Sequence, residues 1–338
     1  MDTFERKTIV TRRSLKYTYY VSRHGESSKQ HPTLFFIHGF PDSARLWADV
    51  VAQLGHLPNQ IIIPNCLGYG GTDKPTDTKM YAYKHQVDDL AEILEAEKSQ
   101  STIVIGHDWG SVVAQRLYLY KRELISGVVL LNTGYMLPSD EPFDLAAVNE
   151  LTKQAWGYPQ FSYWEFFLGP DASEIIDANL ERMWQVLHGD VKDWMKTLFC
   201  TPGAMRAFLL GDENVPLKAY AQRPEWKEHF LQQFRADGFE SALQVYKATA
   251  SNVQFESDLT IPKDRLAIQV PVLFVICSDD AVCQPEIMTP AKGLGLLPDF
   301  KEVVVEAAHW SPMEKPEEIA ANIRDFVIER FASNKASK

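Results

Sequence analysis

An aspartate stands in this 338-residue chain where a serine nucleophile would be expected. The β-branched run TIVIG (102–106) ends in a Gly-x-x-x-Gly corner, GHDWG, whose middle residue is Asp108, and a helical pattern follows. A strand, a tight turn and a helix in this order lift one side chain above a sheet, where the N–H groups of the first helical turn favour an anion. The pattern predicts that Asp108 is a nucleophile; the alternative is an aspartate that only caps the helix.

A carboxylate nucleophile and a hydroxyl nucleophile are suited to different substrates. If an aspartate attacked an ester or amide carbonyl, it would form a mixed anhydride, which is more reactive than the starting compound. Attack on a saturated carbon instead forms an ordinary alkyl ester. The leaving group would then be the oxygen of an opened epoxide or a halide. Because an aspartate is ordinarily ionised at neutral pH, the attack needs no base, and a histidine is left for the second step.

Two later segments could complete such a site. His309 follows the apolar run EVVVE (302–306), and from the end of a strand it could deprotonate the water that hydrolyses the ester. Asp279 and Asp280 follow the run PVLFVIC (271–277), and either could orient the imidazole; their spacing does not decide between them. A loop histidine with only a structural role is the alternative. The order nucleophile, acid, histidine is typical of α/β-hydrolases.

The segment HGFP (38–41) ends another β-rich run, TLFFIH. We expect the backbone N–H groups of Phe40 and Trp109 to form an oxyanion hole. His38 and His107 flank these corners, and we interpret both as structural residues held by local hydrogen bonds. The residues expected to line the substrate pocket are His38, Pro41, Trp164, Phe167 and Trp310.

An epoxide oxygen leaves as an alkoxide and therefore needs a proton. A tyrosine hydroxyl is a suitable neutral donor at neutral pH. The region 138–265 contains several candidates, which the residue types alone do not rank: Tyr158, Tyr163, Tyr220 and Tyr246. For each of them, simple packing with the hydroxyl at the surface is the alternative.

Short β-rich runs that alternate with helical stretches must position these groups. We predict strands at 7–11, 17–21, 33–38, 60–64, 102–106, 127–132, 271–277 and 302–306, and helices near 82–97, 110–121 and 316–331. The later runs are continuously apolar, as in strands covered on both faces. The alternation predicts an α/β fold with a doubly wound, mostly parallel sheet of about eight strands.

The region 138–265 has no buried-strand run, but it is rich in aromatic residues and helical patterns. Because strand patterns resume at 271, we expect a helical cap domain (138–265) inserted into a core domain formed by 1–137 and 266–338. Ligands bind at the carboxyl edge of open α/β sheets, so a cap at that edge would enclose a pocket. Its aromatic residues predict an apolar substrate.

Composition limits the other partners of the chain. The net charge of −11 disfavours nucleic acid and anionic membranes, which require a basic surface. No apolar run approaches the length of about 20 residues that a membrane span needs, and the first residues lack a signal-peptide pattern. The four cysteines show no metal-ligand spacing. We expect a cytoplasmic protein with reduced thiols and with neither a metal nor a cofactor.

Several motifs together resemble the epoxide hydrolases of the α/β-hydrolase superfamily, of the soluble type, over nearly the whole chain. They are HGFPDS (38–43), GYGGTDKP (68–75), GHDWGS (106–111), SDDAV (278–282) and HWSPMEKPEEI (309–319). The family pattern Gly-x-x-Asp-x-Val, with Cys277 in place of the glycine, implies that Asp280 is the acid. Asn65 and Leu67 replace the Asp and Arg usual in the family, which we interpret as a packing change.

The resemblance also selects two tyrosines. FSYWEFF (161–167) and GFESALQVY (238–246) are similar to the family segments whose tyrosines bind and protonate the epoxide oxygen, which implies these roles for Tyr163 and Tyr246. The implied function is hydrolysis of a small apolar epoxide to a vicinal diol, through an alkyl ester on Asp108 and a water activated by His309 with Asp280.

Two other functions are alternatives. A haloalkane or haloacetate dehalogenase would use the same corner, ester and histidine, with the indole N–H of Trp109 as a halide donor. The two tyrosine segments favour the epoxide, because an alkoxide needs proton donors and a halide does not. A non-catalytic ligand receptor on this fold is the third possibility, and the intact nucleophile, acid and histidine argue against it.

Overall fold

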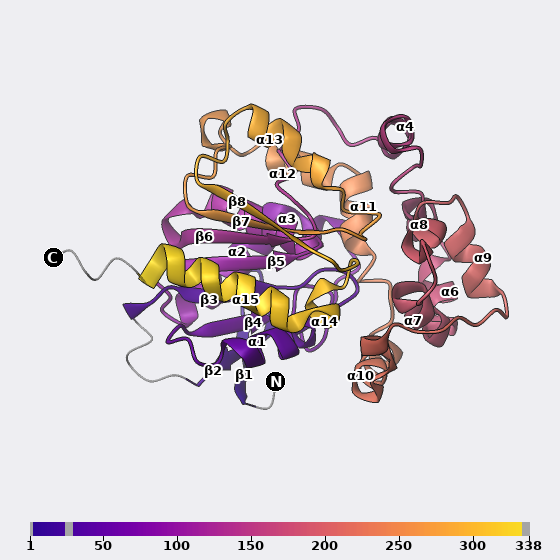
Figure 1. The fold of residues 1–338 in the computed structure, drawn as a ribbon, viewed down its shortest axis with the longest axis horizontal. Helices are drawn as coiled ribbons and strands as arrows, with labels where there is room; N and C mark the ends of the chain where they lie inside the picture. Colours follow the sequence, from indigo (N-terminus) through magenta and orange to yellow (C-terminus); the bar gives the residue numbers. More distant parts are fainter. Residues whose placement is uncertain (1–2, 24–29, 333–338) are drawn as a thin grey trace.

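An eight-stranded sheet lies at the centre of the structure, a computed structural model that describes residues 3–23 and 30–332 (Figure 1). The strand order is β1-β2-β4-β3-β5-β6-β7-β8. β1 and β2 pair antiparallel with each other, β2 is antiparallel to β4, and the other neighbours are parallel. This mostly parallel sheet confirms the predicted fold class. Because the strand order reverses between β3 and β5, the loops after these strands diverge and leave a crevice, where open α/β sheets bind ligands.

Each predicted run forms a strand. The strands are β1 (Phe4–Val10), β2 (Lys16–Ser22), β3 (Thr33–Ile37), β4 (Ile61–Pro64), β5 (Thr102–His107), β6 (Ile125–Leu131), β7 (Val272–Cys277) and β8 (Phe300–Val305). The largest difference between a predicted and an observed boundary is at the start of β1. This edge strand pairs with β2 from Phe4, whereas the prediction begins at position 7. Its polar edge sequence lacks the apolar run that marks the central strands.

Helices cover both faces of the sheet, which explains why the central strands are apolar throughout. α1 (Ala48–Leu54) and α15 (Pro316–Val327) lie on one face; α2 (Tyr83–Ala96), α3 (Trp109–Tyr120) and α13 (Thr289–Gly293) lie on the other. In β3, Leu34 and Phe36 pack into the first of these cores, whereas Phe35 and Ile37 pack into the second. α2, α3 and α15 confirm the predicted helices, although a π-helical turn (Ile328–Ala332) follows α15.

The chain between β6 and β7 is helical. It contains α4 (Leu145–Trp156), α5 (Tyr163–Phe167), α6 (Ala172–Ala178), α7 (Leu180–His188), α8 (Trp194–Phe199), α9 (Ala204–Leu210), α10 (Pro224–Asp237), α11 (Gln244–Ala250) and α12 (Val253–Asp258). Figure 1 shows α6 to α10 gathered beside the sheet, while α11 and α12 lie closer to the core helices. A buried ion pair of 2.6 Å between Arg116 of α3 and Asp258 of α12 fixes the chain where it returns to the core. The domain boundaries at 138 and 265 stay a prediction.

Shorter helical turns connect these elements: η2 (Ala44–Trp47), η3 (Thr78–Tyr81), η4 (Arg122–Leu124), η5 (Ala219–Gln222), η6 (Lys263–Arg265), η7 (Pro285–Met288) and α14 (Ser311–Glu314). Within the described ranges, every helix is too short or too polar to cross a bilayer.

Candidate active site

Asp108 occupies a strained corner between β5 and α3. Its φ of 55° and ψ of −126° lie in a region that residues with a side chain rarely adopt. The corner is also crowded: a Cβ on Gly106 would lie 2.3 Å from the carbonyl oxygen of Gly110, and a Cβ on Gly110 would lie 2.1 Å from that of Ile37. Although Asp108 precedes α3, its side chain makes no capping hydrogen bond. The capping alternative therefore does not account for this aspartate.

The loop after β3 holds the carboxylate of Asp108. The backbone N–H of Phe40 donates to Oδ1 at 2.8 Å. The approach is so close that a Cβ on Gly39 would lie 2.3 Å from the same oxygen. The other oxygen, Oδ2, lies 3.5 Å from Nε2 of His309. The Phe40 N–H thus contacts the carboxylate of Asp108, where an oxyanion-hole donor is expected to lie. The role of the Trp109 N–H stays a prediction.

His309 lies between β8 and α14, where its ring connects two carboxylates. Its Nδ1 is 2.7 Å from Oδ2 of Asp280, on the side of the ring opposite Asp108. Burial alone would lower the pKa of His309, but the charge of Asp280 and the hydrogen bond to Asp108 raise it well above its usual range. Asp279 is exposed, with its Oδ1 near the hydroxyl of Ser278. Of the two candidate acids, the fold therefore places Asp280 against the histidine.

A set of donors keeps Asp280 ionised although it is buried. The side-chain amide of Asn132 donates to Oδ2 at 2.7 Å, and the backbone N–H groups of Val282 and Cys283 donate to Oδ1 at 3.0 and 3.1 Å. Burial would raise the pKa of Asp280, but His309 and these donors hold it below its usual value. Sequence reasoning missed Asn132, which directly follows β6 and carries no motif of its own.

A largely apolar cavity opens in front of Asp108. Besides Asp108 and Tyr163, its lining includes Trp109, Val112, Phe143, Phe161, Trp164, Val282, Cys283 and Ile287. Tyr163 of α5 and Tyr246 of α11 are buried, with ring centres 5.9 Å apart. Burial raises the pKa of both hydroxyls, and Asp108 raises it further, so both stay protonated at neutral pH.

The other two candidate tyrosines are engaged elsewhere. The hydroxyl of Tyr158 donates to the carbonyl oxygen of Ala281 at 3.1 Å, and that of Tyr220 lies 3.1 Å from Nδ1 of His188. Electrostatic contact with Asp108 contributes to the raised pKa of Tyr163 and Tyr246. Tyr163 lines the cavity at Asp108, and the ring of Tyr246 packs against Trp109, the residue after Asp108, with ring centres 5.4 Å apart. The roles of both tyrosines stay a prediction.

The histidines beside the corners are buried in hydrogen-bonded positions. Nε2 of His38 accepts from the Cys66 N–H at 2.9 Å, so its Nδ1 carries the proton and donates to the carbonyl of Gly39. Nε2 of His107 lies 2.7 Å from the carbonyl oxygen of His309. Burial lowers the pKa of both His38 and His107 to about 4. These contacts agree with a structural role and direct the His38 ring into the loop instead of the cavity.

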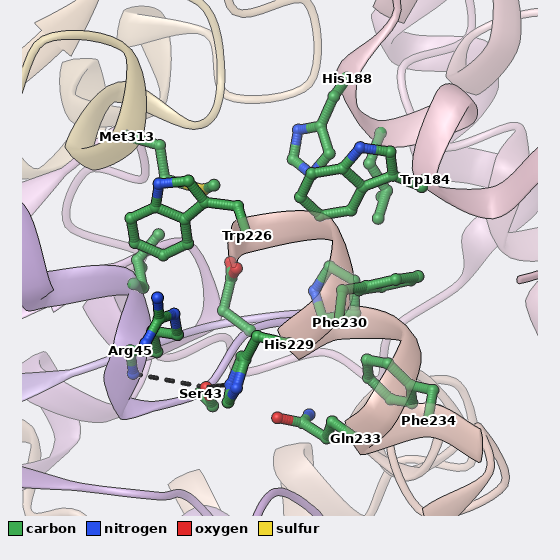
Figure 2. A pocket seen from close by; sticks show the side chains of 14 residues that line it. Ser43, Arg45, Trp184, His188, Trp226, His229, Phe230, Gln233, Phe234 and Met313 are labelled. Atoms are coloured by element: carbon green, nitrogen blue, oxygen red, sulfur yellow. Dashed lines mark hydrogen bonds between the residues drawn. The ribbon is translucent and has the colours of Figure 1, made fainter. Parts of the chain in front are cut away.

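Of the five residues expected to line the pocket, Trp164 lines the cavity at Asp108. Pro41 lines a second cavity between η2 and the helices α7 and α10, where Figure 2 shows Trp184 and Trp226 among the lining side chains. Trp310 lines a third cavity, on the Asp280 side of His309. Phe167 is fully buried and packs against the ring of Tyr246 at 5.0 Å. The position of these residues in the sequence does not show which of them line the cavity at Asp108 and which lie elsewhere.

Sequence reasoning also missed Asp42, although it lies within the HGFPDS motif. Its Oδ2 accepts from the indole N–H of Trp310 at 3.2 Å. Burial raises the pKa of Asp42 to about 7, and the nearby Asp108 contributes in the same direction. Besides Asp108 and Asp280, a third carboxyl group thus lies near His309, and it lines the second cavity together with Pro41.

Comparisons with known proteins agree with this geometry. The chain is 26% identical over 333 residues to Epoxide hydrolase srdG of Neurospora crassa, a match that spans 93% of this chain and 92% of that protein. It is 25% identical to Epoxide hydrolase A of Mycobacterium tuberculosis, over 88% of this chain and 90% of the relative. A match to the rat Bifunctional epoxide hydrolase 2, at 25% identity, spans only 50% of that longer protein. These relatives confirm the resemblance that the motifs indicate.

Solved structures show the same fold. Epoxide hydrolase I of potato (Solanum tuberosum) superposes with a TM-score of 0.74 at 24% identity, over 96% of this chain and 99% of that one. Epoxide Hydrolase A of Mycobacterium thermoresistibile gives a TM-score of 0.76 at 22% identity, over 97% and 99%. The family model described as alpha/beta hydrolase fold matches residues 32–316. The chain therefore belongs to the alpha/beta hydrolase fold family.

Proposed function

We propose that this protein is an epoxide hydrolase that converts a small apolar epoxide to a vicinal diol. The observation that carries the proposal is the arrangement around Asp108. This strained aspartate has a histidine nitrogen at 3.5 Å, one buried tyrosine, Tyr163, in the lining of its cavity, and a second, Tyr246, packed against Trp109 with ring centres 5.4 Å apart. The names of the relatives support the same activity. Neither a cofactor nor a metal enters the proposed reaction.

In the first step, the hydroxyls of Tyr163 and Tyr246 donate to the epoxide oxygen. A carboxylate oxygen of Asp108 attacks one ring carbon from the opposite side, so that a C–O ester bond forms as the ring C–O bond breaks. One tyrosine passes its proton to the developing alkoxide and later recovers a proton from solvent. The raised pKa of both tyrosines keeps this proton in place until an alkoxide, a stronger base, develops.

In the second step, Nε2 of His309 takes a proton from water, and the hydroxide attacks the ester carbonyl carbon of residue 108. The oxyanion would form beside the Phe40 N–H, which already donates to Oδ1 at 2.8 Å. The ester bond then breaks, and the departing alcohol oxygen takes the proton from His309. The second proton of the attacking water, left on the carboxyl group of residue 108, passes to solvent and balances the proton that the tyrosine recovers. The Asp108 carboxylate is thus restored with one oxygen from water.

Alkylation itself prepares His309 for this second step. In the free enzyme the charges and hydrogen bonds of Asp280 and Asp108 stabilise the imidazolium form. Esterification removes the negative charge from Asp108, whose Oδ2 is 3.5 Å from Nε2. The pKa of His309 should therefore fall when the ester forms, which makes the neutral base available at the moment it is needed.

A dehalogenase remains the second candidate, because Trp109 lines the same cavity as Asp108. The two functions differ in what the leaving group requires. A halide leaves without a proton, so a dehalogenase would not need two tyrosines at the nucleophile, whereas an alkoxide would. Assays with haloacetate beside aryl, terminal and fatty-acid epoxides separate the two.

The decisive test is to trap the ester. In a His309→Gln variant, Asp108 can still open styrene oxide, but the base for hydrolysis is missing. Intact-protein mass spectrometry should show one added styrene oxide, and peptide mapping should place it on residue 108. The control is an Asp108→Ala, His309→Gln double variant, which should gain no mass. A folded His309→Gln protein that forms no adduct with any reactive epoxide would overturn the proposed function.

A further inference from the structure

A sulfur, an oxygen and a nitrogen atom that could each bind a metal ion lie close together at Asp108. Within the described part of the chain, the sulfur of Cys283, a carboxylate oxygen of Asp108 and a ring nitrogen of His309 all lie within 4.8 Å of one another. Cys283 is half-buried and lines the cavity in front of Asp108. The three residues follow different strands, β7, β5 and β8, so the sheet brings them together and no sequence spacing reveals them.

The distances suit a small cation that prefers sulfur and nitrogen. Zinc binds Cys, His and Asp ligands at about 2.0 to 2.3 Å in a tetrahedron, which places neighbouring ligand atoms about 3.3 to 3.8 Å apart. Oδ2 of Asp108 and Nε2 of His309 already lie 3.5 Å apart. The sulfur of Cys283 lies within 4.8 Å of the other two ligand atoms and 3.9 Å from Nδ1 of His309, so it would have to move toward Nε2 to complete three corners of the tetrahedron. The fourth corner would take water.

The surrounding hydrogen bonds orient the donor atoms as metal sites require. Nδ1 of His309 is 2.7 Å from Oδ2 of Asp280, which leaves Nε2 directed at Asp108. A carboxylate that holds the far nitrogen of a ligating histidine is the usual outer partner in zinc sites. Asp280 also accepts from the backbone N–H of Cys283 at 3.1 Å, and the hydroxyl of Thr133 lies 3.2 Å from the Cys283 sulfur and could donate to a thiolate.

We propose that Asp108, Cys283 and His309 form an inhibitory binding site for a thiophilic divalent cation, with Zn²⁺ as the expected ligand. Binding displaces the proton of the Cys283 thiol, and any proton on Nε2 of His309, to solvent. The bound cation then blocks both reacting groups. It coordinates the carboxylate oxygen of Asp108 that attacks the substrate and the nitrogen of His309 that activates water. The inhibition rests on the proposed function, whereas cation binding does not. Hard cations such as Mg²⁺, which prefer oxygen ligands, should bind poorly.

Cation binding is tested on the full-length protein with Co²⁺, because a cobalt–thiolate bond has a charge-transfer absorption in the near ultraviolet. The wild type should show this band and lose it when Zn²⁺ is added. Cys283→Ala should show no band. Cys66→Ala is the matched control, since Cys66 is also half-buried beside a histidine, and it should keep the band. Circular dichroism of the metal-free variants confirms that each is folded.

Inhibition is measured separately, with each variant compared to its own metal-free turnover. Zn²⁺ should inhibit the wild type reversibly, with EDTA restoring activity, and Mg²⁺ should not. In Cys283→Ala the half-inhibitory Zn²⁺ concentration should rise more than about 100-fold, beyond the loss typical of outer-shell partners.

A wild type without a thiolate band, or a band or Zn²⁺ inhibition unchanged in Cys283→Ala, would overturn the metal site. If the protein turned over no epoxide, the cobalt titration would still decide whether the cation binds. If epoxide turnover proceeded without a cobalt band, the metal site would fail and the proposed function would stand.

Discussion

The two tyrosines offer a quantitative test of how the epoxide oxygen leaves. Replacing Tyr163 or Tyr246 by phenylalanine removes one hydroxyl and keeps the ring, whose contacts include Phe167 at 5.3 Å and 5.0 Å respectively. A hydrogen bond to a charged group contributes about 1.5 to 3 kcal/mol, so each single variant should slow alkylation about 10- to 150-fold. Either variant retains one tyrosine that can deliver the proton.

The double variant retains neither donor, so its loss should exceed the product of the two single losses. General acid catalysis typically contributes about 10²- to 10⁴-fold, and we expect an excess of at least about tenfold. Stopped-flow tryptophan fluorescence under single-turnover conditions measures the alkylation rate, because Trp109 and Trp164 lie 5.4 and 5.1 Å from the Tyr246 ring. A double variant no slower than the slower single variant would refute proton donation shared by the two tyrosines.

The other predictions concern the nucleophile, the histidine and the fold. Asp108→Ala should abolish styrene oxide turnover without lowering the thermal midpoint; measurable turnover would exclude the ester. Burial would lower the pKa of His309, but Asp280 and Asp108 raise it in the folded protein. The charged imidazolium therefore stabilises the fold fully at a pH below the ordinary histidine pKa, and this contribution is lost as the pH rises through the elevated pKa of the folded state. The unfolding free-energy difference between wild type and His309→Gln should shrink as the pH rises above about 6.5, the ordinary pKa of histidine; an increase would contradict the assigned charges. Asp258→Ala leaves the Arg116 cation buried and unpaired, and should cost about 3 to 5 kcal/mol in urea unfolding; a loss below about 1 kcal/mol would show that the pair is not needed.

The sequence predicted those parts of the site that local pattern determines. The β-branched run and the crowded glycines specify the corner at Asp108, because only glycine fits at 106 and 110. Continuous apolar runs marked the central strands, since both faces of the sheet are covered. Spacing left Asp279 and Asp280 equivalent. The fold separates them, because only Asp280 is turned inward to the donors that surround it.

Other features depend on contacts between distant segments, which no local pattern encodes. Cys283 and Asn132 approach His309 and Asp280 because strands far apart in sequence end at the same edge of the sheet. His38 and Trp310 were expected in one pocket, yet their hydrogen bonds direct the first into the β3 loop and the second toward Asp42. The sequence therefore predicted the proximity of Asp108 and His309, while it did not predict which residues line the cavity.

The central claim is that a carboxylate oxygen of Asp108 bonds to substrate carbon. It is tested most directly by a single turnover in ¹⁸O-labelled water, with enzyme in excess over epoxide. The mechanism predicts a first diol without label and ¹⁸O in the side chain of residue 108, because water attacks the ester carbonyl. Label in the first diol, with none in Asp108, would show that water attacks the epoxide directly and would contradict the mechanism.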